Sequence, residues 1–277
     1  MSEFNDWVGR SQSVTDVLDP ARSNALSVAL GGEGDRKTGD AMPLLHHWLY
    51  FWDVKPPAAL GADGHPAKGG FLPPVPLPRR MWAGGRLNFL KPLLLGSQVT
   101  RTSTITAISK KTGRSGTLVF VTVRHELDVG DGIAVSEEQD LVYREPAAGS
   151  VPAPVAAPAP ATPWLEQIDP DPVLLFRYSA LTMNGHRIHY DKPYAVNEEA
   201  YPGLVVHGPL QATLLVRLAA SNLGGSITGF DFRGQQPAFD GLPLYICGEP
   251  TEDGATVWTQ QGEAKNMVAT VRTKNDA

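Results

Sequence analysis

Alternating β-branched and polar residues dominate the first half of the chain. The alternation runs through residues 98–109 and returns at 117–126 and 133–143, with Thr112-Gly113 as a turn signal after the first run. A period of two places successive side chains on opposite faces of a strand. Together with a shorter run at 85–89, these segments predict an antiparallel sheet.

Helix signals come before these strands. Asp19-Pro20 combines an N-cap residue with a proline at the first helical position, and Gly31-Gly32 ends the segment that follows. Residues 43–51 form a short apolar segment, and residues 57–80 are a Gly- and Pro-rich loop. The first half therefore predicts helical material followed by a meander of strands.

The second half has a similar order. We expect a short strand at 174–181 and one long helix at 203–223, closed by Gly224-Gly225. Further strands are expected near 226–233, 243–251, 254–262 and 265–273. A long helix packed on one curved antiparallel sheet is an α+β arrangement, and two such halves suggest an internal duplication.

Residues 145–163 are almost wholly proline and alanine. Such a segment cannot form a helix or a sheet ladder, so we expect an extended, polyproline-like connector. It separates a predicted N-terminal domain, residues 1–145, from a predicted C-terminal domain, residues 165–277, with a linker at 146–164.

Composition narrows the class of protein. The formal net charge of -5 and the pI of ≈ 5.8 give no electrostatic footprint for nucleic acid. One cysteine, Cys247, rules out an intrachain disulfide and a multi-cysteine zinc site. No apolar run approaches the length of a membrane span, and the acidic start has no apolar segment behind it. We expect a cytoplasmic protein with neither nucleic-acid nor membrane partners.

Candidate chemistry gathers in the second half. Asn184, His186 and His189 lie within six residues of one another. Histidine has the side-chain pKa nearest neutrality, so it moves a proton at little cost. Further on, Gly208-Pro209 opens the long apolar helix, and free N–H groups at a helix start can bind a developing oxyanion. A proton-transfer group followed by an oxyanion site is what chemistry next to a carbonyl requires.

Residues 174–223 resemble the MaoC-like, (R)-specific enoyl-CoA hydratases. Their signature, Ser-Gly-Asp-x-Asn-Pro-hydrophobic-His, is matched by the run from Thr182 to His189, with the terminal histidine in place. Asn184 stands where the typical hydratase has aspartate. The segment from Leu204 to Pro209 resembles the helix start of the same family. The resemblance implies a hot-dog fold, in which an antiparallel sheet wraps a helix.

The first half narrows the resemblance. Residues 48–51, 69–85 and 91–93 resemble the double-hot-dog branch. That branch includes the mesaconyl-C4-CoA (3-methylfumaryl-CoA) and itaconyl-CoA hydratases and the type 2 hydroxyacyl-thioester dehydratases. The resemblance implies an α+β double hot dog that reversibly hydrates an α,β-unsaturated acyl-CoA. The favoured substrate is a short branched C5 dicarboxylic thioester, and no cofactor is expected, because CoA is part of the substrate.

The resemblance also implies roles for three residues. His189 is the general base that activates water toward C3. Asn184 orients that water, because an amide has no useful proton affinity. The backbone N–H of Gly208 stabilises the enolate-like thioester oxygen. Each residue also has a purely structural interpretation. His189 could be hydrogen-bonded at a turn, Asn184 could form an Asx turn, and Gly208 could allow close helix packing.

The substrate-binding residues are less defined. An arginine suits both a carboxylate and the phosphates of CoA, although a loop arginine is often only solvated. The candidates are His207, Arg79, Arg80, Arg86, Arg187, Arg233 and Trp82, and Trp48 and Phe71 line either an acyl pocket or the core. His186 and Asp191 are candidate supporters of the base, with loop stabilisation favoured for His186. His46-His47 lack the spacing of a metal helix, so we expect no metal site.

Other readings stay open. One is a general (R)-3-hydroxyacyl-thioester dehydratase. Another is an acyl-CoA thioesterase, which shares the fold but normally needs a carboxylate base, so Asn184 counts against it. A third is an inactive acyl-CoA-binding protein. Hot-dog units commonly pair, so the fused chain either works alone as a pseudo-dimer or associates further into a homodimer.

Overall fold

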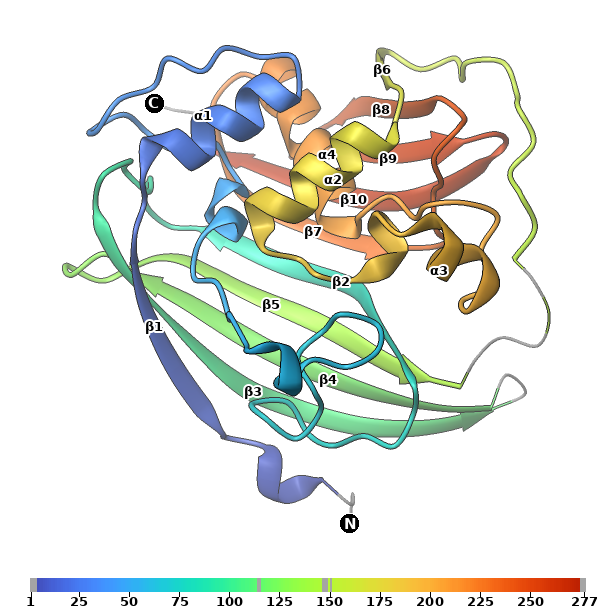
Figure 1. Ribbon diagram of the computed structural model, residues 1–277. Coiled ribbons are helices and arrows are strands. Elements are labelled where there is room, and N and C mark those ends of the chain that lie inside the picture. Colours follow the sequence, from blue (N-terminus) through green and yellow to red (C-terminus); the bar gives the residue numbers. More distant parts are fainter. Residues whose placement is uncertain (1–3, 114–115, 146–148, 150, 275–277) are drawn as a thin grey trace.

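One curved antiparallel sheet organises the molecule. The computed structural model describes residues 4–113, 116–145, 149 and 151–274. Their strands follow the order β1-β3-β4-β5-β2-β7-β10-β9-β8-β6, and the helices gather on one side of the sheet (Figure 1). The first five strands to occur along the chain are β1 (Ser11–Val17), β2 (Arg79–Phe89), β3 (Gln98–Gly113), β4 (Gly116–Asp128) and β5 (Ile133–Arg144). The others are β6 (Trp164–Ile168), β7 (Ser226–Gly234), β8 (Leu244–Thr251), β9 (Gly254–Gln261) and β10 (Ala264–Lys274).

The two halves of the sheet have the same topology. In space the first half runs β1-β3-β4-β5-β2 and the second runs β6-β8-β9-β10-β7, which is the same permutation. They join edge to edge through β2 and β7, with Leu87 opposite Phe230 and Gly85 opposite Phe232. A Cβ on Gly85 would lie 2.6 Å from the Phe232 Cζ atom, so glycine is what allows this phenylalanine to pack across the seam.

The helical elements are α1 (Pro20–Ala29), α2 (Pro172–Thr182), α3 (Lys192–Asn197) and α4 (Gly208–Asn222), with short 3-10 turns η1 (Asn5–Trp7), η2 (His46–Leu49), η3 (Pro57–Ala59) and η4 (Arg187–His189). Helix α4 is the long helix of the second half, and its buried residues pack on β7 to β10. It begins at Gly208, five residues later than expected, because Val205 pairs with Phe239 as an isolated bridge.

The strand expected at 174–181 is wrong. These residues belong to α2, which begins after an N-cap aspartate, Asp171, with Pro172 at its first position, and ends at Met183 with φ 52°. The buried residues Leu175, Tyr178 and Ser179 follow the three- and four-residue spacing of a helix face. The Asp171-Pro172 pair was the sequence signal for a helix start, since Asp19-Pro20 begins α1 in the same way.

The other sheet predictions agree with the structure to within a few residues at most ends, apart from the longer β2, and two strands were missed. Strand β1 lies at an edge and is largely exposed, so it has no buried, apolar face to detect. Strand β6 has five residues and directly follows the Pro/Ala segment. Both pair with interior strands of the sheet, β1 with β3 and β6 with β8.

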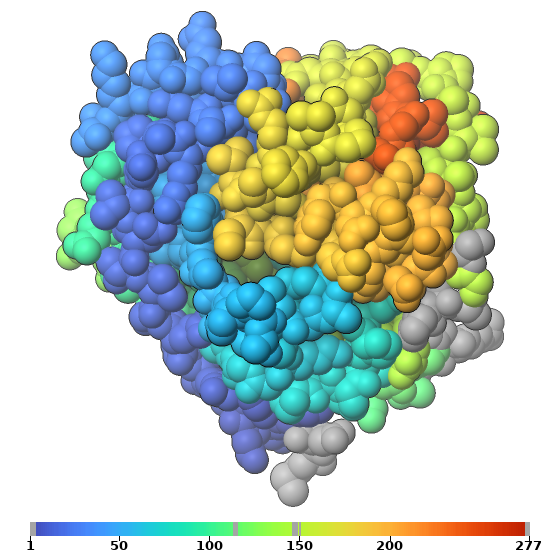
Figure 2. All heavy atoms as spheres, in the orientation of Figure 1, coloured from blue at the N-terminus to red at the C-terminus, as the bar shows by residue number. Residues whose placement is uncertain are grey.

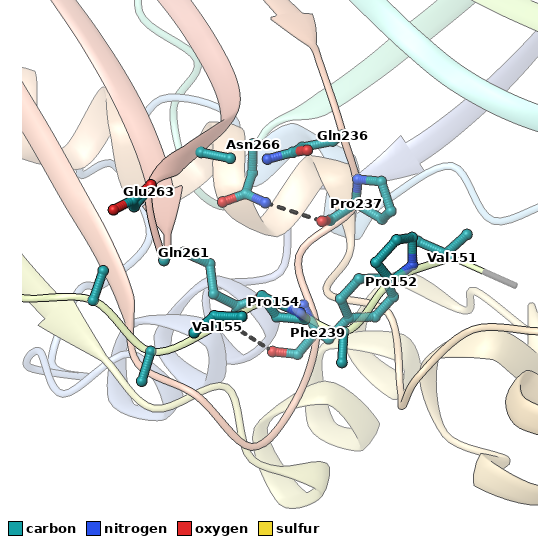
Figure 3. A pocket seen from close by; sticks show the side chains of 15 residues that line it. Val151, Pro152, Pro154, Val155, Gln236, Pro237, Phe239, Gln261, Glu263 and Asn266 are labelled. Atoms are coloured by element: carbon teal, nitrogen blue, oxygen red, sulfur yellow. Dashed lines mark hydrogen bonds between the residues drawn. The ribbon is translucent and has the colours of Figure 1, made fainter.

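The Pro/Ala segment lies against the second half. Residues 151–163 contain neither helix nor strand, as expected, whereas 146–148 and 150 are outside the described residues. The Val151 N–H donates to the Ala200 carbonyl at 3.1 Å, and the Thr162 hydroxyl donates to the Gly248 carbonyl at 2.8 Å. A cavity of ≈ 550 Å³ lies between residues 151–157 and the turn that joins β9 to β10 (Figure 3). Among its described lining residues, only Glu263 is ionisable.

The main apolar core runs continuously through both halves. It includes Leu87 and Leu127 from the first half and Leu214 and Phe230 from the second. A smaller cluster, around Val75 and Tyr143, fills the concave side of the first half. Within the part of the chain that the structure describes, no helix is long and apolar enough to cross a membrane.

Candidate active site

Four imidazoles form a continuous row beside the start of α4. The ring centroids of His65 and His186 are 4.1 Å apart, those of His186 and His189 are 5.4 Å apart, and those of His189 and His207 are 3.7 Å apart. The last three residues come from the motif and the helix start that the sequence singled out. His65 comes from the first half. We call these four residues the histidine row.

His189 is held in a form suited to accept a proton. Its Nδ1 atom lies 2.7 Å from the Val205 carbonyl oxygen, which can only accept, so Nδ1 carries the hydrogen and Nε2 has a free lone pair. The side chain is buried, and burial lowers the pKa of His189 to about 4. The imidazole is therefore neutral at physiological pH, as a general base must be.

His207 connects His189 to the surrounding helices. Its Nε2 atom is 2.8 Å from the Ser179 hydroxyl on α2, and its ring stacks on His189. The same Ser179 accepts the Asn184 N–H through its backbone oxygen at 2.8 Å. The end of α2, the motif loop and the start of α4 are thus fixed to one another. Among the described residues, the buried Nδ1 atom of His207 has no hydrogen-bond partner.

Asn184 makes the Asx turn that the sequence offered as its structural reading. Its Oδ1 atom accepts the backbone N–H of His186 at 3.0 Å. This bond uses the acceptor end of the amide, while within the described residues no bond is recorded for its Nδ2 donor. The turn therefore fixes the amide in place and leaves a donor, so the structural and functional readings are compatible.

Gly208 is the first residue of α4, and within the described residues its N–H donates to no acceptor. The preceding His207 makes no side-chain cap, and Pro209 has no N–H. A Cβ on Gly208 would lie 3.0 Å from the Trp82 Cε3 atom, so only glycine fits comfortably against this indole. Trp82 also packs on Trp48, with ring centroids 5.3 Å apart. Trp82 and Gly208 thus meet where the two halves join.

The first half contributes a loop that sequence reasoning missed. Asp63 Oδ2 lies 2.9 Å from His65 Nδ1, and the Asp63 carbonyl accepts the Arg187 N–H at 2.9 Å. Gly64 has φ +87°, and a Cβ there would lie 2.0 Å from the Gly185 oxygen, so the two loops touch backbone to backbone. Figure 2 shows the cyan first-half segment against the yellow and gold second-half residues, with a hollow where they meet.

The five candidate arginines separate into two groups. Arg79, Arg80 and Arg187 lie near the junction of the halves. Arg79 pairs with Glu199 at 3.0 Å, and Arg187 pairs with Asp191 at 2.7 Å and lies over the Tyr194 ring. No ion-pair partner of Arg80 occurs among the described residues. Its positive charge helps to lower the pKa of both His65 and His186, although burial is the larger cause for each.

Arg86 and Arg233 lie on the outer face of the sheet. Arg86 pairs with Asp140 at 2.7 Å and with Glu138 at 3.2 Å. Arg233 is exposed, and it alternates with the buried Phe232 on β7, so it points away from the histidine row. The structure brings neither side chain to the site.

A metal ion is a second reading of the outer end of the row. Asp63, His65 and His186 each offer a ligand atom, and these atoms lie within 4.8 Å of one another. Carboxylate and imidazole are ligands for zinc and similar ions. Asp63 and His65 also share a hydrogen bond, between Oδ2 and Nδ1, which favours an acid–base pair. The sequence-based expectation of no metal site stays a prediction.

Known proteins resemble this chain over most of its length. The family model of hydroxyacyl-thioester dehydratase type 2 matches residues 45–240. The mesaconyl-C(4)-CoA hydratase of Chloroflexus aurantiacus is 47% identical over 254 residues, which cover 91% of each protein. A MaoC-like dehydratase from Phytophthora capsici superposes with a TM-score of 0.69 at 15% identity, covering 97% of this chain and 96% of that one. A Mycobacterium tuberculosis protein described as a double hotdog gives a TM-score of 0.55 at 14% identity, with 96% of each chain covered.

Proposed function

Because this chain belongs to the family of type 2 hydroxyacyl-thioester dehydratases, we propose that its substrate is a short branched dicarboxylic enoyl thioester of the mesaconyl-C4-CoA kind. The enzyme is a hydro-lyase that interconverts an enoyl thioester and water with a hydroxyacyl thioester. The substrate class is supported by the 47% identity to a mesaconyl-C(4)-CoA hydratase.

One observation carries the proposed chemistry. His207 links the two groups: its ring stacks on His189, whose Nε2 atom is free, and it directly precedes Gly208, whose N–H is open. A base and an oxyanion donor at adjacent positions suit addition to a double bond conjugated with a carbonyl.

The hydration step follows from this arrangement. His189 Nε2 takes a proton from water while the water oxygen forms a bond to C3. The C2–C3 π pair moves toward C2, and negative charge develops on the thioester oxygen, where the Gly208 N–H stabilises it. A donor aimed at such developing charge is typically worth about 3 kcal/mol. The thioester carbonyl then re-forms as C2 takes up a proton, which His189 is placed to return.

Asn184 positions the water in this scheme. Its Oδ1 atom is committed to the His186 N–H, so the Nδ2 group is the end that is left to donate. An amide cannot act as a base, and His189 is therefore the group that accepts the proton from water. The typical MaoC-like hydratase has an aspartate at this position, whereas an amide orients water without exchanging protons.

The interior of the first half supports a short acyl chain. The concave side of its sheet is filled by Val75, Leu77 and Tyr143, which are 0%, 7% and 0% exposed. A long alkyl chain would have to displace this cluster. The junction between the halves therefore suits an acyl group of a few carbons that ends beside the histidine row.

The test is an assay of the purified protein with four thioesters. Mesaconyl-C4-CoA is expected to lose its enone absorbance without release of free thiol, with a kcat/KM well above the values for itaconyl-CoA, crotonyl-CoA and a long-chain 2-enoyl-CoA. A preference for crotonyl-CoA would contradict the dicarboxylic assignment and favour a general dehydratase. Release of free thiol would indicate a thioesterase, and no reaction at all would indicate a binding protein.

A further inference from the structure

We propose that Arg80 and the Asp63–His65 pair form a subsite for the free carboxylate of the acyl group, and that His65 takes up a proton when this carboxylate binds. The inference deepens the proposed function, since it assigns the residues that would select a dicarboxylic thioester. It also assigns a task to a loop of the first half that the hydration chemistry does not use.

The first argument is an excess of positive charge at this end of the row. Arg80 has no ion-pair partner among the described residues. Lys68 lies nearby, close enough to the Arg80 charge to be affected by it, and its Nζ atom donates only to the carbonyl of Leu77. Asp63 is the one carboxylate recorded as affecting this group. Two cations facing one anion leave room for a second anion.

The second argument is the orientation of His65. Asp63 accepts from the His65 ring through Oδ2 at 2.9 Å and from its backbone N–H through Oδ1 at 3.0 Å. Because the carboxylate only accepts, Nδ1 of His65 carries a hydrogen and Nε2 is free. An aspartate behind an imidazole stabilises its protonated form, so this ring can take up a proton and then donate from Nε2 to a carboxylate.

The third argument is an unsatisfied hydroxyl behind Arg80. Tyr143 is opposite Arg80 in the β2–β5 pairing and is fully buried. Arg80 acts on this hydroxyl, but a guanidinium can only donate, so within the described residues the Tyr143 O–H has no acceptor of its own. An anion held by Arg80 would supply an acceptor for this buried O–H group, which removes the cost of leaving it unpaired.

The position fits the chemistry of the proposed substrate. In mesaconyl-C4-CoA the free carboxylate is attached to C3, the carbon that receives water. Its receptor must therefore lie close to the base. The His65 ring contacts His186, and His186 contacts His189, so the subsite is two ring contacts away from the base. The side chains of His65 and Asp63 are 22% and 32% exposed, so solvent can supply the proton.

Proton uptake follows from the charges around His65. The groups that face it are Asp63, Arg80 and His186, with Lys68 beyond them. Burial lowers the pKa of His65, and Arg80 lowers it further, whereas Asp63 acts in the opposite direction. A carboxylate bound at Arg80 cancels the repulsion and adds an attraction to the imidazolium. The pKa of His65 must then rise, and the ring gains a proton from solvent.

Binding of saturated thioesters tests the subsite without relying on turnover. Succinyl-CoA and butyryl-CoA have acyl groups of similar size, and only the first has a free carboxylate. Arg80→Met should weaken succinyl-CoA binding by about 10- to 100-fold, the range of a buried charge-assisted pair, with butyryl-CoA affected less than about threefold. Arg233→Met is the matched control, because that arginine is exposed on the outer face. Arg80→Lys should recover part of the preference and guards against a folding defect.

Titration calorimetry in buffers of different ionisation enthalpy measures how many protons the protein takes up when a thioester binds. At pH 7, wild-type protein should take up protons on binding succinyl-CoA and none on binding butyryl-CoA, and His65→Gln should abolish the uptake. If Arg80→Met and Arg233→Met changed the affinity for succinyl-CoA equally, the subsite would be overturned. Loss of the succinyl-CoA preference after treatment with EDTA would also overturn it, because that result indicates a metal ion. Binding as described in a protein that hydrates no thioester would leave the subsite intact and contradict the proposed function.

Discussion

The two halves of the molecule have the same strand permutation but differ at one point, the start of the central helix. In the second half, the bridge between Val205 and Phe239 leads into α4, which runs for 15 residues. In the first half, the bridge between Ala41 and Leu94 leads into η2, which stops after 4 residues. Phe51, with φ 60°, turns the chain away into the loop at 53–78.

Under the proposed function, this difference assigns catalysis to the second half and recognition of the acyl group to the first. The second half keeps a helix start, and with it an open N–H and a stacked base. At the equivalent place, the first half buries Glu137, which accepts from His47 and from the Trp48 indole. The loop at 53–78, which follows η2, extends across the junction and carries Asp63 and His65. The comparison predicts that substitutions in the second half change turnover and those around Glu137 change stability.

The largest expected effect tests the catalytic half. His189→Ala should lower kcat by at least about 10²-fold, because a general base of this kind contributes about 10²–10⁴-fold. The melting temperature should change little, since the ring makes one hydrogen bond, to Val205. Steady-state kinetics with the preferred enoyl thioester and thermal denaturation measure the two quantities. Near-normal turnover in a folded variant would remove His189 from the mechanism.

The next effect tests the structural half. Glu137→Ala should destabilise the fold by about 3 kcal/mol, because it leaves the buried donors of His47 and Trp48 without an acceptor. The kcat of the folded Glu137→Ala protein should stay within about twofold of the wild-type value. Urea unfolding measures the loss of stability. The adjacent Glu138→Ala removes only half-exposed pairs with Arg86 and Arg124 and should cost under about 1 kcal/mol. A large loss of kcat in the folded Glu137 variant would contradict the division of labour.

A smaller effect separates the two readings of Asn184. Asn184→Ala should lower kcat by roughly 10-fold or more, since it removes both the Asx turn and the remaining donor. Asn184→Asp keeps the acceptor that receives the His186 N–H and supplies the carboxylate of the typical MaoC-like hydratase, so it should retain a substantial part of the activity. The ratio of the two kcat values is the measurement. A fully active alanine variant would show that the amide is only a loop residue.

The smallest expected effect is a shift along the pH axis. An ordinary histidine base loses activity below its pKa of 6.5, whereas burial lowers the pKa of His189 to about 4. The rate should therefore hold between pH 7 and pH 5 and fall as pH drops through about 4. The free energy of unfolding should begin to fall at a higher pH than the rate does. His46, His125 and His189 have lowered pKa values, so the unfolded chain binds more protons between pH 6.5 and 4, and the free energy of unfolding should decrease over that range. A kcat that halves near pH 6.5 would contradict the buried, neutral base.

Strands were easier to predict from the sequence than the site. The long alternating runs of β3, β4 and β5 lie in a half-buried sheet, where the pattern is reliable. The apolar run at 174–181 has no such alternation, and its Asp-Pro start was the only cue for a helix. Residue types and spacing singled out Asn184, His189 and Gly208, the family resemblance supplied their roles, and those roles remain proposals. Asp63 and His65 were missed because they reach the motif from more than 110 residues away.

The arginines could not be ranked for a specific physical reason. Arg80, Trp82 and Arg86 all occupy even positions on one strand, so strict alternation would place them on one face. A bulge between Trp82 and Gly84 shifts the register by one residue and reverses the faces beyond it. Arg80 and Trp82 therefore face the junction, whereas Leu87 is buried and Arg86 lies outside. Gly84-Gly85 is a local hint of that bulge, because glycine inside a strand often marks one, but the pair does not reveal by how much the register shifts.

The contact between Gly64 and Gly185 has a consequence for how this protein can evolve. The two backbones are so close that a methyl group on either glycine would clash with the other loop. The two halves therefore cannot be separated or shifted at this point by even the width of a side-chain carbon without losing the contact. The histidine row is completed only when both halves are folded and docked. Two separate chains would have to find this alignment by association, whereas one covalent chain keeps the partners permanently together. A single chain therefore keeps the histidine row assembled, and a change in the loop that carries His65 is transmitted to the loop that carries His186.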